Sequence, residues 1–191
     1  GLPQTAPAMD VMKVNYAGTR HLTEKLIPLM SEGGAIASIS STGGMGWSRK
    51  IPLLMEFVQM ADFDEIMQWC DENAETVGSG YALSKEAIIV WTMFASSHLI
   101  KRGIRINCTL PAPTQTPMMD HFESATDAAV LNTFIQPINR RATPQEQAGP
   151  LVCLNSDALG YVNGVVLPVD GGFMGAVTTG QADLSALMPS A

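Results

Sequence analysis

The sequence has little positive charge. Its 191 residues include 11 Lys and Arg against 18 Asp and Glu, which gives a formal net charge of -7. A nucleic-acid surface needs clustered Lys and Arg to neutralise phosphates, but the basic pairs Arg49-Lys50, Lys101-Arg102 and Arg140-Arg141 lie far apart along the chain. The composition therefore predicts no nucleic-acid partner.

Long apolar runs and targeting signals are also missing. No stretch of 18 or more apolar residues is present, so the sequence predicts no transmembrane helix. The first residues, Gly1 to Gln4, lack the basic and apolar regions of a signal peptide. We therefore expect a soluble, cytoplasmic protein with no membrane partner.

Cysteine is scarce. Cys70, Cys108 and Cys153 are widely separated, odd in number and without CxxC or Cys/His spacing. We therefore expect three core thiols and no metal site. Because 46% of the residues are hydrophobic and only 15% are charged, the chain can bury one substantial core, and we expect residues 1–191 to form a single domain.

A long helix is predicted over Asp10–Met30. Its apolar residues recur at helical spacing, which predicts one buried face, and Pro28 is expected to disturb its last turn. The residues expected on the buried face are Val14, Leu22, Leu26 and Leu29.

Strand and helix signals then alternate. The short apolar run Ala35–Ile39 is typical of a strand that is buried on both faces. A helix over Tyr81–Lys101 ended by Gly103, a strand over Ile104–Leu110, a helix capped by Thr143 and a strand over Gly164–Val169 are expected to follow. This order predicts an α/β fold with a doubly wound, Rossmann-like parallel sheet.

The pentad Tyr81-Ala82-Leu83-Ser84-Lys85 carries the strongest chemical signal. Tyr81 and Lys85 are four residues apart on a predicted helix, so the ammonium can lie beside the phenol. A nearby positive charge favours the phenolate, and we therefore expect Lys85 to lower the pKa of Tyr81 and make it a general acid/base. The alternative is a helix face on which the lysine covers apolar surface with its stem.

Six ordered elements together resemble the short-chain dehydrogenase/reductase family. The resemblance covers nearly the whole chain and rests on more than the pentad. The matching elements are Val14-Asn15-Tyr16-Ala17-Gly18, Ser40-Ser41-Thr42-Gly43-Gly44, Tyr81 to Lys85, Arg105-Ile106-Asn107, Pro111 through Thr116-Pro117, and Val169-Asp170-Gly171-Gly172.

The resemblance implies a set of catalytic residues. Tyr81 would exchange a proton with the substrate oxygen, and Lys85 would lower its pKa. Ser41 would hydrogen-bond the substrate oxygen, with Ser40 as the less favoured choice. Asn15 would hold a water that links the lysine to solvent, the alternative being a structural amide in a helix kink or at the surface.

The resemblance also implies NAD or NADP as cofactor. Tyr81 and Lys85 would face the nicotinamide ribose, whose hydroxyls suit the three donors of an ammonium. Pro111 and Thr116 would lie beside the nicotinamide, with Thr116 contacting its carboxamide. The implied activity is NAD(P)-dependent interconversion of a primary or secondary alcohol and its carbonyl.

One part of the family pattern is absent from the sequence. The glycine-rich TGxxxGxG turn, which places a pyrophosphate at a helix N-terminus, does not occur. Gly1 resembles the last residue of the NNAG motif that follows this turn in the family, so we expect an N-terminally truncated domain that contains only the C-terminal portion of the fold. The alternative function is a non-catalytic fragment or interaction module that cannot bind dinucleotide without the missing segment.

The chain also contains an expected insertion at about residues 45–80. Ser41 and Tyr81 are 40 positions apart, a longer gap than is usual in the family. This insertion, together with Gln147-Ala148-Gly149-Pro150-Leu151 in the last predicted helix, resembles the subgroup of bacterial 3α-hydroxysteroid and coniferyl-alcohol dehydrogenases. An amphipathic helix around Phe63 to Cys70 is predicted within it. Its apolar content indicates contact with a partner subunit or a cap over the substrate.

Substrate preference is expected to depend on the loop after Pro113. Met118, Met119 and Phe122 would form an adaptable apolar wall that suits a steroid or an aromatic alcohol. The alternative is a lid helix that packs on the core. We expect a small apolar alcohol or ketone as the substrate and a homodimer or homotetramer as the assembly.

Overall fold

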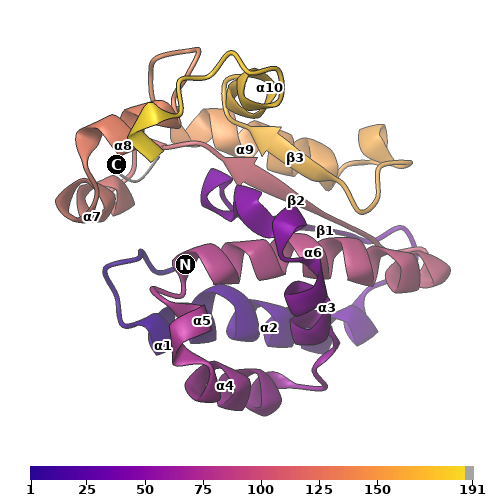
Figure 1. Cartoon of the computed structure of the whole chain (residues 1–191). Helices are drawn as coiled ribbons and strands as arrows, with labels where there is room; N and C mark the ends of the chain where they lie inside the picture. The colour runs from indigo at the N-terminus through magenta and orange to yellow at the C-terminus, as the bar shows by residue number, and fades with distance from the viewer. Residues whose placement is uncertain (188–191) are drawn as a thin grey trace.

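The computed structural model describes residues 1–187, and its centre is a parallel sheet of three strands (Figure 1). The strands are β1 (Ala35–Ile39), β2 (Arg105–Pro111) and β3 (Val166–Val169), in the order β1-β2-β3. Ala35 lies opposite Arg105, and Cys108 lies opposite Val166. Because all three strands are parallel, the residues that follow them meet at one edge of the sheet.

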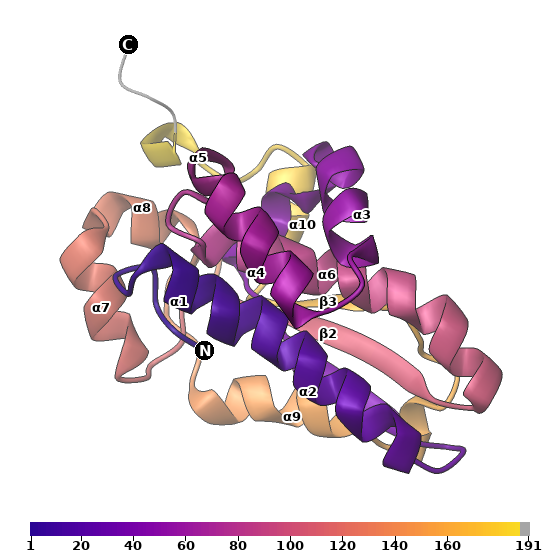
Figure 2. The ribbon, with the colours of Figure 1, turned by 90° about the horizontal axis from the view of Figure 1, so that it is seen from below.

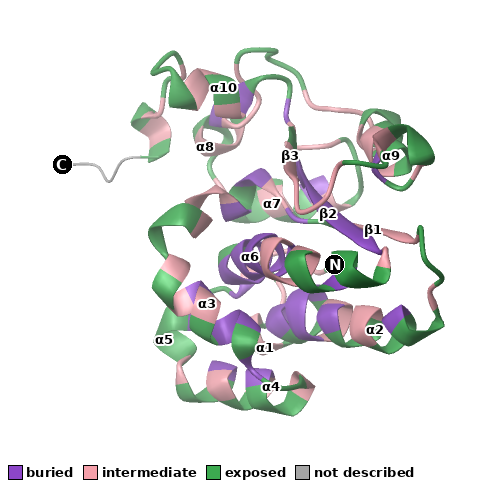
Figure 3. Cartoon of the chain, turned by 90° about the vertical axis from the view of Figure 1, so that its right-hand side faces the viewer, coloured by how far each residue is buried: buried purple, intermediate pink, exposed green. Residues whose placement is uncertain are grey.

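Helices cover both faces of this sheet. α6 (Tyr81–Leu99) packs against one face, and α9 (Pro144–Leu154) packs against the other. β2 is buried between these layers, whereas much of α9 is exposed on its outer side (Figure 3). The structure confirms the predicted α/β class with a doubly wound parallel sheet.

The predicted first helix forms a nearly continuous rod (Figure 2). It consists of α1 (Ala8–Met12), the π-helical segment η1 (Lys13–Gly18), α2 (Thr19–Leu26) and the 3-10 turn η2 (Ile27–Leu29). The turn at η2 contains Pro28, as the sequence predicts.

The prediction of which face of this rod is buried is wrong. Val14, Leu22, Leu26 and Leu29 are 44–81% exposed, whereas Met12, Tyr16 and Arg20 are buried. The π-helical segment bonds residues five apart and so interrupts the 3.6-residue repeat on which the prediction rested. The face with Tyr16 is then the one that packs against the rest of the chain.

The residues expected to form an insertion fold into helices that complete the core. They include the greater part of η3 (Thr42–Arg49) and all of α3 (Ile51–Gln59), α4 (Phe63–Glu72) and α5 (Ala74–Val77). Phe57 is fully buried. Its ring stacks on the ring of Tyr16 and also contacts the ring of Trp69, with 5.0 Å between ring centroids in each pair. The predicted helix around Phe63 to Cys70 is confirmed as α4, but its apolar residues contact their own chain.

A buried arginine ties the same layer together. Arg20 donates hydrogen bonds to Glu24 and to the carbonyls of Val58 and Met60, at 2.6, 3.2 and 2.8 Å. These carbonyls lie at the C-terminal end of α3, where a guanidinium supplies donors that the helix itself lacks. The contact holds α3 against α2.

The later helix boundaries follow the sequence signals. Gly103 ends the α6 region in a left-handed conformation, after the 3-10 turn η4 (Ile100–Arg102). Thr143 and Glu146 form the predicted capping box of α9, and the helix continues through Pro150. The remaining elements are α7 (Met118–Ala125), α8 (Ala128–Thr133), η5 (Asp157–Leu159), α10 (Phe173–Thr178) and η6 (Ser185–Leu187).

The prediction of three core thiols is correct for Cys70 and Cys108, which are buried, and wrong for Cys153, which is exposed. Cys153 lies on the solvent side of α9, where the helix needs only one buried face. Within residues 1–187, no helix combines the length and the apolar character needed to cross a bilayer.

Candidate active site

Tyr81 and Lys85 lie in the first turns of α6. The helix begins after Gly80, which has φ 75°, and a methyl group added there would lie 2.6 Å from the carbonyl oxygen of Ala8. Only glycine fits this left-handed, closely packed position. Gly80 therefore fixes the angle at which Tyr81 enters the site.

Ser41 reaches the same place from the end of β1. A methyl group added at Gly43 would lie 3.2 Å from Tyr81 Cε1 and 3.4 Å from Ser41 Oγ, so both side chains flank this glycine. Ser41 Oγ accepts a hydrogen bond from the Gly43 amide at 3.0 Å. Ser40 has a different environment, because it is buried and its hydroxyl donates to the Lys85 carbonyl at 2.7 Å.

The environment of Tyr81 contradicts one prediction. Burial raises the pKa of Tyr81 above its usual value of 10.0, and hydrogen bonding with Ser41 opposes this rise. Lys85 Nζ lies 5.7 Å from the centre of the Tyr81 ring. In this structure the pKa of Tyr81 is thus raised rather than lowered, because the loss of hydration dominates, and Lys85 is not among the groups that shift it.

Lys85 is itself buried, with 8% of its surface exposed. Burial lowers the pKa of its amine from 10.5 to about 8, because an ammonium loses its hydration inside the protein. Nζ donates one hydrogen bond, to the carbonyl oxygen of Ile39 at 3.1 Å. Its other donor positions have no hydrogen-bond partner within the described chain, so they are available to a ligand.

The lowered pKa of Lys85 predicts a pH-dependent effect of Lys85→Met on stability. The unfolded chain binds more protons than the folded one between pH 8 and pH 10.5, so burial of the ammonium costs most below pH 8 and least above pH 10.5. We expect the variant to be more stable than the wild type by up to about 3 kcal/mol at pH 7, with a gain that shrinks as the pH rises through this window.

Urea unfolding at pH 7 and pH 10 measures this effect. Lys101→Met, at an exposed lysine of η4, is the matched control and should show little change at either pH. A stability difference that is the same at both values would contradict the assignment of a depressed pKa to Lys85.

Asn15 lies in the π-helical segment η1 and is buried, with 2% of its surface exposed. Its amide accepts a hydrogen bond from the Leu2 backbone N–H at 2.6 Å and donates to the Leu2 carbonyl at 2.9 Å. Its side chain therefore fastens the N-terminal segment beside the site. Single π-helical turns occur often at functional sites, and the sequence indicates Asn15 but not this turn.

The predicted site residues share one cavity of about 1110 Å³. Ser41, Tyr81 and Lys85 line it together with Asn15, Pro111 and the exposed Thr116. The structure thus brings the predicted catalytic and cofactor residues to one place, at the carboxyl ends of the strands, where α/β sheets bind ligands.

α7 supplies the apolar side of this cavity. Met118, Met119 and Phe122 all line it, and Met119 is buried. The ring of Phe122 meets the ring of Tyr81 edge to face, with centroids 5.1 Å apart. α7 is helical, as the alternative of a lid helix expects, but its residues line the cavity, as the apolar-wall hypothesis expects.

Two polar residues of the cavity were given no site role by the sequence. Thr42 donates a hydrogen bond to the Pro111 carbonyl at 3.2 Å and so joins the turn after β1 to the end of β2. Gln147 of α9 donates to the Val169 carbonyl at 3.0 Å, while its buried Oε1 has no hydrogen-bond partner among residues 1–187. Only the packing of α9 against the sheet brings Gln147 here.

Asn107 and Asp170 have structural roles. The Asn107 side-chain amide donates a hydrogen bond to the Val162 carbonyl and accepts one from the Val165 N–H. These two bonds fix the loop before β3. Asp170 accepts hydrogen bonds from the amides of Gly172 and Met174 at the start of α10. Within residues 1–187, no group of three or more His, Cys, Asp or Glu side chains could hold a metal ion.

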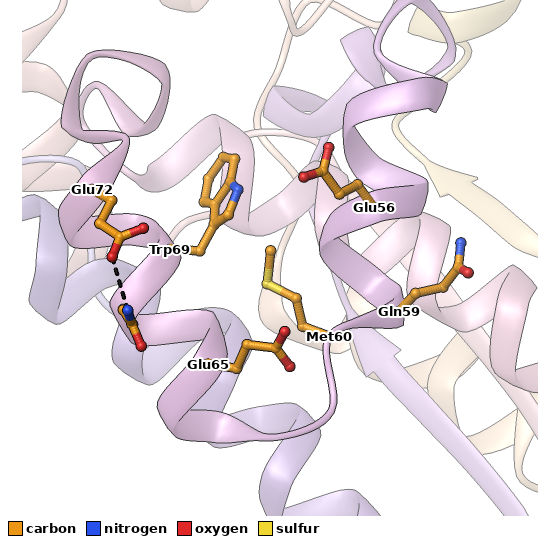
Figure 4. A pocket seen from close by; sticks show the side chains of 7 residues that line it. Glu56, Gln59, Met60, Glu65, Trp69 and Glu72 are labelled. Carbon is orange, nitrogen blue, oxygen red and sulfur yellow. Dashed lines mark hydrogen bonds between the residues drawn. The ribbon is translucent and has the colours of Figure 1, made fainter.

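A second hollow, of about 500 Å³, shares no lining residue with this site. Figure 4 shows the side chains that line it. Its wall is formed by α3, α4 and the residue that follows α3, and it carries three glutamates around Trp69 and Met60. The residues of α3 and α4 do not line the larger cavity. Ser79, within the expected insertion at about residues 45–80, does line the larger cavity. The two alternatives for the insertion, a contact with a partner subunit and a cap over the substrate, both stay predictions.

The fold and the site define an α/β protein of the Rossmann-like class, with serine, tyrosine and lysine converging at the carboxyl ends of a parallel sheet. The family described as enoyl-(acyl carrier protein) reductase matches residues 69–174. The chain belongs to the short-chain dehydrogenase/reductase family, and its predicted membership is confirmed.

Individual relatives refine this assignment. The chain is 31% identical over 173 residues to a coniferyl-alcohol dehydrogenase of Pseudomonas sp. (strain HR199), a match that covers 90% of this chain and 68% of that protein. It is 28% identical over 176 residues to the 3α-hydroxysteroid dehydrogenase/carbonyl reductase of Comamonas testosteroni, covering 89% and 68%.

A solved structure supports the same fold. The NADH complex of the 3α-hydroxysteroid dehydrogenase from Pseudomonas sp. B-0831 matches with a TM-score of 0.77 and 25% identity, covering 96% of this chain and 73% of that one. The predicted likeness to the hydroxysteroid and coniferyl-alcohol dehydrogenase subgroup is therefore confirmed.

Proposed function

We propose that this protein is an NAD(P)-dependent oxidoreductase that interconverts an apolar alcohol and its carbonyl. The observation that carries the proposal is that Ser41, Tyr81 and Lys85 line the same cavity, of about 1110 Å³. The membership of an oxidoreductase family supports it, as do the names of the relatives, which are alcohol and hydroxysteroid dehydrogenases.

The residues of the cavity fit the nicotinamide ribose end of a dinucleotide. Lys85 uses one N–H on the Ile39 carbonyl, and its remaining donors suit ribose hydroxyls. Thr116 and Pro111 lie on the same cavity, where they would contact the nicotinamide. The cofactor would supply or accept the hydride.

The chain's own residues would handle the proton. Tyr81 would exchange a proton with the substrate oxygen, and Ser41 would hydrogen-bond that oxygen as its charge develops. Because the pKa of Tyr81 is raised, its phenol holds a proton at neutral pH and is ready to act as an acid. We therefore expect carbonyl reduction to be favoured at neutral pH and alcohol oxidation to gain as the pH rises.

Substrate class follows from the apolar side of the cavity. Met118, Met119 and Phe122 offer polarizable and aromatic contacts without charge. Such a wall suits an aromatic alcohol or a 3α-hydroxysteroid. Assembly into a homodimer or homotetramer remains a prediction, which light scattering would test.

Turnover measurements with two substrate classes test the proposal. The protein would be mixed with NAD⁺ or NADP⁺ and either coniferyl alcohol or a 3α-hydroxysteroid, while the absorbance of reduced nicotinamide is followed. Reduced nicotinamide is expected with at least one pair. If calorimetry detects no dinucleotide binding and no pair reacts, the non-catalytic interaction module is the better description.

A further inference from the structure

Glu86 is a buried carboxylate to which the proposed chemistry gives no role. It follows Lys85 on α6 and has 2% of its surface exposed. A buried carboxylate is costly unless it is paired. Its ion pair is with Lys50, whose Nζ lies 2.9 Å from Glu86 Oε2. The Lys50 side chain is 47% exposed, so the pair joins a partly solvated residue to a buried one.

Lys50 comes directly after η3, the segment that follows Ser41. This segment lies flat on the first turns of α6. A methyl group added at Gly44 would lie 3.0 Å from the backbone carbon of Lys85, and one added at Gly46 would lie 2.8 Å from Glu86 Oε1. The two glycines therefore allow the segment to approach α6 more closely than other residues would.

A second anchor lies on the other side of Ser41. The Ser40 hydroxyl donates to the Lys85 carbonyl at 2.7 Å. Ser41 is therefore held between two contacts, from Ser40 to Lys85 and from Lys50 to Glu86. Both contacts fall on neighbouring residues of α6, Lys85 and Glu86, about one turn after Tyr81.

We infer that Glu86 is a positioning residue, whose ion pair with Lys50 holds the segment after Ser41 on α6 and keeps the Ser41 hydroxyl aligned with Tyr81. The inference rests on the proposed function for its effect on catalysis. Without the pair, the segment has one anchor fewer, and Ser41 would spend less time within reach of the substrate oxygen. Small losses of alignment at a reacting centre have large effects on rate.

A double-mutant cycle separates positioning from simple structural support. Glu86→Gln is expected to lower kcat by about tenfold with little change in the KM for dinucleotide. In a Ser41→Ala background the same change is expected to lower kcat by less than about twofold, because its effect passes through Ser41. An equal loss in both backgrounds, or no loss in either, would overturn the inference.

Variants of Lys50 provide a check at an accessible position. Lys50→Met should reproduce the loss caused by Glu86→Gln, whereas Lys50→Arg retains the charge and should restore most of kcat. Lys101→Met is the control for removing an exposed lysine outside the site. Equal kcat in Lys50→Met and the wild type would contradict a role for the pair.

Hydrogen exchange makes the inference testable even if no turnover is found. Amides of residues 42–50 are expected to exchange faster in Glu86→Gln and Lys50→Met than in the wild type, while those of β2 stay unchanged. If the wild type shows no activity but the two variants still exchange residues 42–50 faster than it does, the proposed function is refuted and the anchoring role stands. Unchanged exchange of residues 42–50 would refute the anchoring role.

Discussion

Tyr81→Phe is expected to lower kcat by about 10³-fold while leaving the fold intact. The change removes only the hydroxyl that would exchange a proton with the substrate oxygen. The ring remains and keeps its edge-to-face contact with Phe122, at 5.1 Å between centroids. Steady-state kinetics in both reaction directions, with circular dichroism as a check on folding, measure the effect.

The binding of dinucleotide provides the internal comparison for this variant. Because the hydroxyl acts on the substrate oxygen, the Kd for NAD(H) or NADP(H) should change far less than kcat. Tyr161→Phe is the matched control, since Tyr161 is fully exposed and lies outside the cavity. Turnover that survives in Tyr81→Phe would remove Tyr81 from the mechanism.

Phe57→Ala is expected to lower the free energy of unfolding by about 4 kcal/mol. Phe57 of α3 is fully buried. Its ring contacts Tyr16 of the first helical rod and Trp69 of α4, so it joins α3 to both. Its removal would leave a cavity between these layers. Urea unfolding followed by tryptophan fluorescence measures the loss.

Tyr161→Ala is the control for deleting an aromatic ring. Tyr161 is fully exposed, so its removal should change the free energy of unfolding by no more than about 0.5 kcal/mol. If Phe57→Ala proved equally mild, residues 51–72 would be a peripheral attachment, and their apolar side chains would not belong to the main core.

The sequence predicted the central sheet and the convergence of the site with few errors. β1, β2 and β3 are short apolar runs with clear ends, and their parallel order follows from the helices between them. Because parallel strands end at one edge, Ser41 after β1 and Pro111 at the end of β2 had to lie near each other. Four-residue spacing on a helix then brought Tyr81 and Lys85 together.

Other features could not be predicted because they depend on tertiary packing. The prediction of the buried face of the first helix was wrong for two reasons. A π-helical turn interrupts the 3.6-residue repeat, and α3 and α4 cover Tyr16 rather than the leucines. The sequence predicted a lowered pKa for Tyr81, whereas burial, which residue spacing does not reveal, raises it. No site role was predicted for Gln147 or Glu86, because their hydrogen-bond partners are distant in sequence.

Transfer of deuterium from substrate to cofactor tests the central claim most directly. The wild-type protein would be incubated with NAD⁺ or NADP⁺ and an aromatic alcohol or hydroxysteroid that carries deuterium on its carbinol carbon, and the reduced nicotinamide would be analysed by mass spectrometry. The proposed oxidoreductase predicts one deuterium per reduced nicotinamide, with almost no labelled cofactor from Tyr81→Phe. Carbonyl product without deuterium in the nicotinamide, or equal labelling by the two proteins, would contradict it.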